Sequence, residues 1–199
     1  MLAIVAPGQG AQTPGFLTPW LEDPQFASRL AELSEVVGID LVHYGTEADA
    51  ETIRDTAIAQ PLLVAAGLLA AEALTGPELP FAGADVAAGH SVGEITAAAG
   101  VGVLSAADAM VFVRERAQGM AEASALTPTT MAAVLRGDPA EVLAAIEAVG
   151  ATAANNNGSG QVVAAGTVEQ IEALKANPPA KARIIPLSVA GAFHTHHME

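Results

Sequence analysis

The sequence predicts an α/β protein, because short apolar runs typical of buried strands alternate with longer segments of helical pattern. A first strand is expected at Leu2 to Ala6, where the apolar run ends in a turn-forming Pro-Gly-Gln-Gly segment. A second is expected at Asp85 to Ala88, directly before Gly89-His90-Ser91-Val92-Gly93 and a helix at Glu94 to Ala99. The loop at Pro7 to Gly10 is the first candidate site, and the glycine-flanked serine, in a sharp turn between a strand and a helix, is the sharpest one.

Three longer segments before residue 127 carry helical patterns: Pro19 to Val37, Asp49 to Leu74 and Ala106 to Ala123. We expect the second to be interrupted at Pro61, since a proline is tolerated in the first turn of a new helix. The third is a regular amphipathic helix whose apolar face is formed by Met110, Val113, Ala117 and Met120.

From about Thr127 the pattern becomes strand, helix, strand, strand, helix, strand, which is the ferredoxin-like order. We therefore expect residues 127–190 to form a small subdomain, and residues 1–126 with 191–199 to form the main domain. The expected elements of the subdomain are Met131 to Leu135, Pro139 to Ala148, Ala151 to Asn155, Gln161 to Ala165, Val168 to Ala176, and Arg183 to Val189.

Composition excludes several function classes. The 199 residues include 22 acidic and 8 basic side chains, and a net charge of −14 argues against a protein that neutralises nucleic acid phosphates. The absence of cysteine excludes disulfides, thiolate metal sites and a cysteine nucleophile, and it fits a cytoplasmic protein. The apolar stretches Leu62 to Ala71 and Ile95 to Ala107 are shorter than the roughly 20 residues that cross a bilayer. We expect neither nucleic acid nor membrane as a partner.

The segment around Ser91 suits nucleophilic chemistry. Flanking glycines permit a strained turn that exposes the hydroxyl, and amides at the following helix N-terminus stabilise an oxyanion. A serine needs a base, most often histidine. His90 is adjacent on the turn and points away, and His43 has the features of an ordinary histidine. The remaining three lie in Phe193-His194-Thr195-His196-His197, which lacks metal-ligand spacing, so no metal site is predicted.

Arg116 lies in the amphipathic helix without an acidic neighbour at helical spacing. The residues three and four positions away are Phe112, Val113, Gly119 and Met120. Its counter-charge therefore comes from another segment or from a ligand carboxylate. Alternatively, its stem lies along apolar surface with the guanidinium in water. Spacing alone leaves both interpretations open.

Taken together, these segments resemble the malonyl-CoA:acyl carrier protein transacylases, acyltransferases of fatty-acid and polyketide synthesis. The resemblance covers the whole chain and implies an α/β-hydrolase-like core with an inserted ferredoxin-like small subdomain. The motifs that carry it occur in family order: Pro7-Gly8-Gln9-Gly10-Ala11-Gln12, Ala59-Gln60-Pro61, Gly89-His90-Ser91-Val92-Gly93-Glu94, Arg116-Ala117-Gln118-Gly119-Met120, Ala154-Asn155 through Gln161-Val162-Val163, and Gly191-Ala192-Phe193-His194.

The resemblance also implies roles for single residues. Ser91 would be the nucleophile, His194 its general base and acid, and the backbone amides of Gln9 and Val92 the oxyanion hole. Arg116 would pair with the free carboxylate of malonate. The malonyl group would pass from malonyl-CoA to the serine and then to the phosphopantetheine thiol of acyl carrier protein, without a metal or bound cofactor. The phenylalanine before the histidine resembles the signature of malonyl rather than methylmalonyl transfer.

Family members continue beyond the position that matches Glu199, so the resemblance implies that the C-terminal part of the core is missing. We then expect an exposed apolar patch and a histidine without its orienting carbonyl. One alternative is a non-catalytic fragment or carrier-protein-binding module. A third possibility, an α/β-hydrolase esterase, lacks the HGGG-type loop and gives Arg116 no role. Three basic residues, Lys175, Lys181 and Arg183, are expected to help dock the acidic carrier protein.

Overall fold

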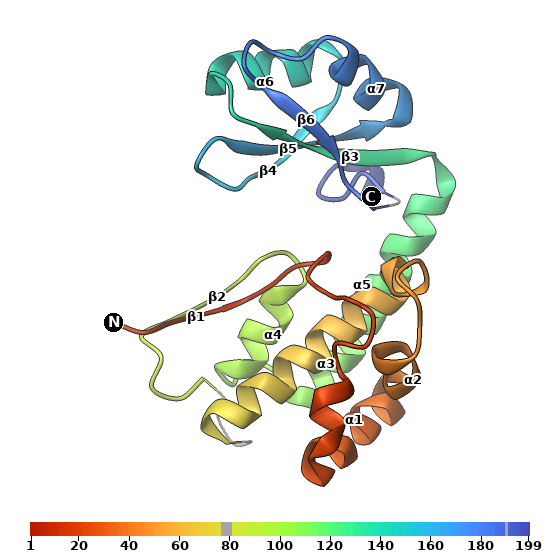
Figure 1. Ribbon diagram of the computed structural model, residues 1–199, viewed down its shortest axis with the longest axis vertical. Helices are drawn as coiled ribbons and strands as arrows, with labels where there is room; N and C mark the ends of the chain where they lie inside the picture. The colour runs from red at the N-terminus through yellow and green to blue at the C-terminus, as the bar shows by residue number, and fades with distance from the viewer. Residues whose placement is uncertain (77–80, 190) are drawn as a thin grey trace. The chain divides into compact units, whose positions relative to one another are not determined.

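The computed structural model describes residues 1–76, 81–189 and 191–199 (Figure 1). It divides into two compact units, Met1–Gln118 (unit 1) and Gly119–Glu199 (unit 2). Helix α5, Ala106–Leu126, contributes residues to both. Both units contain helices and strands, so the predicted α/β class is confirmed. The domain bounds expected from the sequence, 1–126 with 191–199 and 127–190, stay a prediction.

The sheet of unit 1 consists of two parallel strands in the described residues. Strand β1 (Ala3–Ala6) pairs with β2 (Val86–Gly89), so that Ala3 lies opposite Val86 and Ala6 opposite Gly89. Figure 1 shows the two strands side by side, with α4 (Gly93–Gly100) packed along them. The strands leave apolar side chains in solvent, since Val5 is 73% and Val86 49% exposed. Their main contribution is to bring the loops at their carboxyl ends together.

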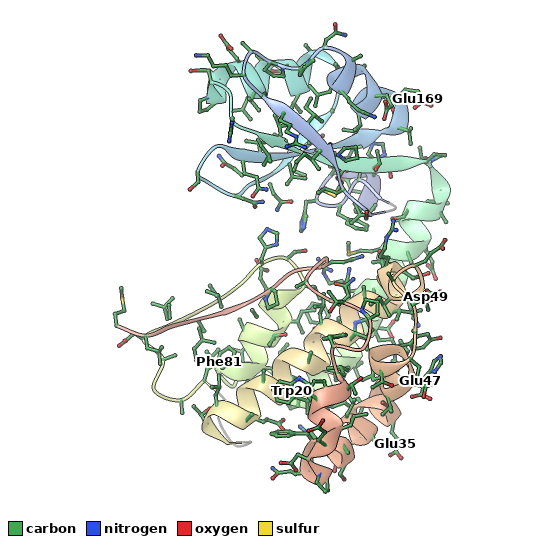
Figure 2. All side chains as sticks on the ribbon, in the orientation of Figure 1. Trp20, Glu35, Glu47, Asp49, Phe81 and Glu169 are labelled. Atoms are coloured by element: carbon green, nitrogen blue, oxygen red, sulfur yellow. The ribbon has the colours of Figure 1, made fainter. Side chains whose placement is uncertain are left out.

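The core of unit 1 is formed mainly by helices. These are α1 (Pro24–Val37), α2 (Leu41–Thr46), α3 (Thr56–Thr75), α4 and α5, with short 3-10 turns at Thr18–Glu22 and Thr52–Arg54. The central cluster draws on all five helices and includes Leu30, Leu33, Leu41, Leu62, Leu68, Ile95, Met110 and Val113. A smaller cluster places Phe81 against Ala71 of α3 and Ala97 of α4; Phe81 is labelled in Figure 2.

The single helix expected at Pro19 to Val37 is two elements. The 3-10 turn η1 ends at Glu22, and Asp23 then caps α1, its carboxylate accepting the Gln25 backbone N–H at 2.8 Å. An aspartate that satisfies an N-terminal amide in this way stabilises the start of a new helix, which is why the chain turns here. Helix α2 and the 3-10 turn η2 at Thr52–Arg54 were not predicted as separate elements, since both are too short to show periodicity.

Helix α3 runs without interruption through Pro61, which corrects the expected break. It begins at Thr56, where the Asp55 carboxylate accepts the Ala57 N–H at 2.8 Å. A proline in the second turn removes one helical hydrogen bond, and burial of Pro61, Leu62 and Leu63 offsets that loss. The helix therefore has 20 residues and is apolar and long enough to cross a membrane, but 56% of its apolar window is buried inside the protein, as in a core helix.

Unit 2 has the element order predicted from the sequence. Its elements are β3 (Thr129–Leu135), α6 (Pro139–Ala148), β4 (Thr152–Asn156), β5 (Gln161–Thr167), α7 (Val168–Ala176) and β6 (Arg183–Pro186). The strands form an antiparallel sheet in the order β4-β5-β3-β6. Strand β6 is shorter than expected. It ends at Pro186, which has no N–H to donate to a neighbouring strand. The next residue, Leu187, donates its N–H to the Met131 carbonyl at 2.9 Å.

The sheet of unit 2 is covered on both faces (Figure 1). Helices α6 and α7 pack on one face, around a cluster that includes Val134, Ile146, Ile171 and Leu174. On the other face, Met131, Val163 and Ala165 contact Ala192 and Phe193 near the C-terminus. The segment that carries His194 is therefore fixed to the sheet by apolar packing.

Candidate active site

Ser91 lies in a strained turn between β2 and α4. Its φ is 55°, a left-handed conformation that is unfavourable for a residue with a side chain. The two flanking glycines allow the backbone to pass close to itself. A Cβ at Gly89 would lie 2.1 Å from the Glu94 nitrogen, and one at Gly93 would lie 2.3 Å from the Ala6 carbonyl oxygen. A side chain at either glycine position would therefore collide with the backbone. The turn places Ser91 just before the start of α4.

The loop after β1 lies against this turn. The His90 N–H donates to the Ala6 carbonyl at 3.0 Å, and a Cβ at Gly8 would lie 2.7 Å from His90 Nδ1. Within residues 1–76, 81–189 and 191–199, the backbone N–H groups of Gln9 and Val92 donate no hydrogen bond. The two amides with unused donor capacity thus belong to the two segments that meet at the carboxyl ends of β1 and β2.

Arg116 reaches this turn from α5. Its Nη2 donates to Ser91 Oγ at 3.2 Å, and its Nη1 donates to Gln60 Oε1 at 2.5 Å. Burial lowers the pKa of the guanidinium, and the Glu94 carboxylate opposes that effect. None of the described carboxylates forms an ion pair with Arg116. The half-buried guanidinium thus has polar partners in two other segments, neither of which carries a counter-charge, so a ligand carboxylate as its charged partner stays a prediction.

Gln60 is a site residue that sequence reasoning did not identify. It appeared only within the landmark Ala59-Gln60-Pro61, although it lies in an apolar helix where a buried amide needs partners. Its side chain is 1% exposed, and its Nε2 donates to Gln9 Oε1 at 3.5 Å. Gln9 Nε2 in turn donates to the Arg54 carbonyl and to Thr56 Oγ1, both at 3.3 Å. A chain of polar contacts therefore links the loop after β1 to Arg116.

His194 belongs to unit 2, whereas Gln9, Ser91, Val92 and Arg116 belong to unit 1. It has a φ of 60° and follows Phe193, which is only 6% exposed. The preceding backbone is bound to β3, since the Ala192 N–H donates to Thr129 Oγ1 at 2.9 Å. The following residue closes the turn, with Thr195 Oγ1 donating to the Ala192 carbonyl at 2.6 Å. The histidine thus lies on a turn anchored at both ends.

The histidines at positions 43, 196 and 197 contact other side chains of the protein. His43 is exposed on α2, with its Nδ1 3.2 Å from Glu47 Oε2. The rings of His196 and His197 lie 4.2 Å apart. The described part of the chain contains no group of three or more His, Cys, Asp and Glu side chains that could hold a metal ion.

Similarity to known proteins places the chain in a family. The family model of the acyl transferase domain matches residues 4–199, and the chain belongs to that family. The malonyl CoA-acyl carrier protein transacylase of Mycobacterium bovis is 51% identical over 199 residues, which are 100% of this chain and 66% of the relative. That of Mycolicibacterium smegmatis is 55% identical over 182 residues, covering 92% of this chain and 62% of the relative.

The chain is also similar to solved structures of malonyl transacylases. The chain matches the crystal structure of MCAT from Mycobacterium tuberculosis with a TM-score of 0.94 and 51% identity, over 100% of this chain and 66% of the other. It also matches a type II PKS acyl-carrier protein complex with its malonyl-transacylase, with a TM-score of 0.88 and 31% identity, over 99% and 66%. The chain thus spans about two thirds of the length of the proteins that it resembles.

Proposed function

We propose that this chain transfers the malonyl group of malonyl-CoA to the phosphopantetheine thiol of acyl carrier protein through a malonyl-serine at Ser91. The observation that carries the proposal is the Arg116 guanidinium, half-buried and 3.2 Å from Ser91 Oγ. In malonyl-serine, two carbon atoms separate Oγ from the free carboxylate carbon. An arginine that reaches Oγ therefore also reaches that carboxylate, which would take the place of the hydroxyl as its acceptor.

The first half of the reaction forms the malonyl-serine. His194 accepts the proton of the Ser91 hydroxyl, and Oγ attacks the thioester carbonyl carbon. The backbone N–H groups of Gln9 and Val92 donate to the oxyanion of the tetrahedral intermediate. The carbon–sulfur bond then breaks, and coenzyme A leaves with the proton held by His194.

The second half reverses these roles. The carrier protein thiol gives its proton to His194, and its sulfur attacks the serine ester. The carbon–oxygen bond breaks and the proton returns to Oγ. Neither half uses a metal or a bound cofactor. Water must be kept from the ester, because it would release malonate instead.

Arg116 also accounts for substrate choice. Acetyl-CoA has no carboxylate, so acetyl transfer would leave the guanidinium buried without a charged partner. Phe193 supports malonyl over methylmalonyl through its resemblance to the malonyl-type signature.

Acyl carrier protein is the proposed partner, and Lys175, Lys181 and Arg183 are the proposed docking cations. Lys175 also forms an exposed ion pair with Glu172 at 3.1 Å. We place the protein in the cytoplasm.

Unit 1 is interpreted as part of an α/β-hydrolase-like core, supported by its parallel strands and the strand, serine turn, helix sequence at β2 and α4. Residues 127–190 are interpreted as the inserted ferredoxin-like subdomain, supported by the element order and the sheet order β4-β5-β3-β6. An esterase is the weaker alternative, because hydrolysis of a simple ester leaves Arg116 without a role.

The test is covalent labelling followed by intact-mass analysis. Incubation with malonyl-CoA should add one malonyl group to the protein, and peptide mapping should find it on Ser91. Ser91→Ala should remain unlabelled, whereas Ser28→Ala, a change on the exposed side of α1, should be labelled like the parent chain. Malonyl addition to the Ser91→Ala protein would refute the proposal. Equal labelling by acetyl-CoA would refute the role of Arg116 and favour the esterase.

A further inference from the structure

We propose that Gln60 is a specificity-determining positioning residue, which orients the Arg116 guanidinium through a neutral oxygen and so leaves its positive charge available to the acyl carboxylate. The inference rests on the proposed function and extends it to a residue that carries no chemistry itself. It starts from the contact between Arg116 Nη1 and Gln60 Oε1 at 2.5 Å.

The guanidinium is held at two points that come from different elements. Nη1 donates to Gln60 of α3, and Nη2 donates to Ser91 Oγ in the turn before α4. Because the guanidinium is planar, fixing both terminal nitrogens fixes its tilt and its direction. If a carboxylate replaced Ser91 as the acceptor of Nη2, the contact with Gln60 would still hold the group in place.

The orientation of the Gln60 amide follows from its neighbours. Gln9 Nε2 donates to the Arg54 carbonyl and Thr56 Oγ1, so Gln9 presents its Oε1 to Gln60. Only Gln60 Nε2 can donate to that oxygen, at 3.5 Å. The Gln60 oxygen is therefore directed at Arg116, as required for an acceptor. Gln9 thus contributes its backbone N–H to the proposed oxyanion hole and its side chain to this alignment.

The neutrality of Gln60 matters because of where Arg116 lies. Gln60 is 1% exposed, and no carboxylate among the described residues forms an ion pair with Arg116. A glutamate at position 60 would have almost the same shape and would accept the same hydrogen bond. It would also neutralise the guanidinium, so that an incoming carboxylate would have to compete with a resident one. An amide orients the arginine without this competition.

The test is a malonate titration of the full chain, followed through the side-chain Nε–H signals of its arginines by NMR. Arg116→Lys identifies the Arg116 signal. We expect malonate to shift that signal in the parent chain and acetate to shift it much less. Gln60→Glu should weaken malonate binding at least tenfold. Gln25→Glu adds the same charge at an exposed position of α1 and should leave binding unchanged.

A second variant separates charge from packing. Gln60→Met keeps the length of the side chain but removes the acceptor, so Arg116 should keep its charge and lose its orientation. We expect malonate binding to weaken about threefold to fivefold, less than in Gln60→Glu. A purely structural role for Gln60 predicts the opposite order, because methionine differs more from glutamine than glutamate does. Unfolding midpoints of both variants check that the fold is retained.

The possible outcomes are distinct. Parent-like malonate binding by either Gln60 variant would overturn the inference, and so would a parent chain whose Arg116 signal ignores malonate. A chain that binds malonate at Arg116 with the expected order of variants, but is never malonylated on Ser91, would contradict the proposed function and leave the role of Gln60 intact.

Discussion

The two units are stabilised by different parts of their structure. Unit 2 has a four-stranded antiparallel sheet whose central strands β3 and β5 are buried, with helices on one face and the Phe193 segment on the other. Unit 1 has two described parallel strands with exposed Val5 and Val86, and most of its buried side chains come from helices. In unit 2 the sheet is the core, whereas in unit 1 the sheet mainly positions loops.

This difference separates stability from function in unit 1. The strands β1 and β2 contribute little apolar burial, yet their carboxyl ends carry Gln9 and Ser91. The helices contribute most of the burial and also deliver Gln60 and Arg116 to the same place. A change in the helical core should therefore affect the free energy of unfolding, and a change at the strand ends should mainly affect the site.

The largest effect is expected from Leu68→Ala in α3. Leu68 is 1% exposed in the helical core, so truncation leaves a cavity and should lower the free energy of unfolding by about 2–5 kcal/mol. Val5→Ala, in the exposed part of β1, should change it by less than about 0.5 kcal/mol. Urea unfolding of both variants measures the difference. Similar losses in the two would show that the sheet of unit 1 is a stabilising core after all.

Gly89→Ala should lower the free energy of unfolding less than Leu68→Ala does, but it should disturb the candidate active site more. The new Cβ would lie 2.1 Å from the Glu94 backbone nitrogen, so the serine turn must shift. We expect a loss of about 1–3 kcal/mol and loss of Ser91 labelling by malonyl-CoA.

Gly119→Ala is the matched control. Gly119 lies within α5, and a Cβ there would meet no described atom within 4 Å beyond the neighbouring backbone of its own helix. Alanine should raise stability by about 0.5–1 kcal/mol through its higher helix propensity. If Gly89→Ala were equally well tolerated and still labelled on Ser91, the steric explanation of the motif would be wrong.

Among the three test substitutions, the smallest loss is expected in unit 2, from Asp138→Ala. The Asp138 carboxylate accepts the backbone N–H groups of Ala140 at 2.9 Å and Glu141 at 3.2 Å, and so caps α6. Loss of this cap should cost about 1 kcal/mol, measured by urea unfolding. Asp138→Asn should restore most of the loss, because an asparagine oxygen caps as well. A neutral result for the alanine variant would mean that sheet packing alone fixes the helix.

The sequence predicted unit 2 better than unit 1, for a physical reason. Helices α6 and α7 begin at strong caps, Asp138 before Pro139 and Thr167 with Gln170, and their bounds match the expected ones. In unit 1, Pro61 suggested a break in α3 that is absent, because burial around it overrides a local preference. Local signals suffice where caps and turns delimit an element, and they fail where tertiary packing decides.

The candidate site divides in the same way. The glycine-flanked serine between a predicted strand and a predicted helix was enough to predict the strained turn, and helical spacing singled out Arg116 as a charge without a helical partner. Only the tertiary structure shows which groups the Arg116 guanidinium contacts. Residues 60, 91 and 116 are far apart in the chain, and no periodicity links a glutamine of α3 to an arginine of α5. Their contacts exist because helix packing in unit 1 brings three separate elements to the end of one short sheet.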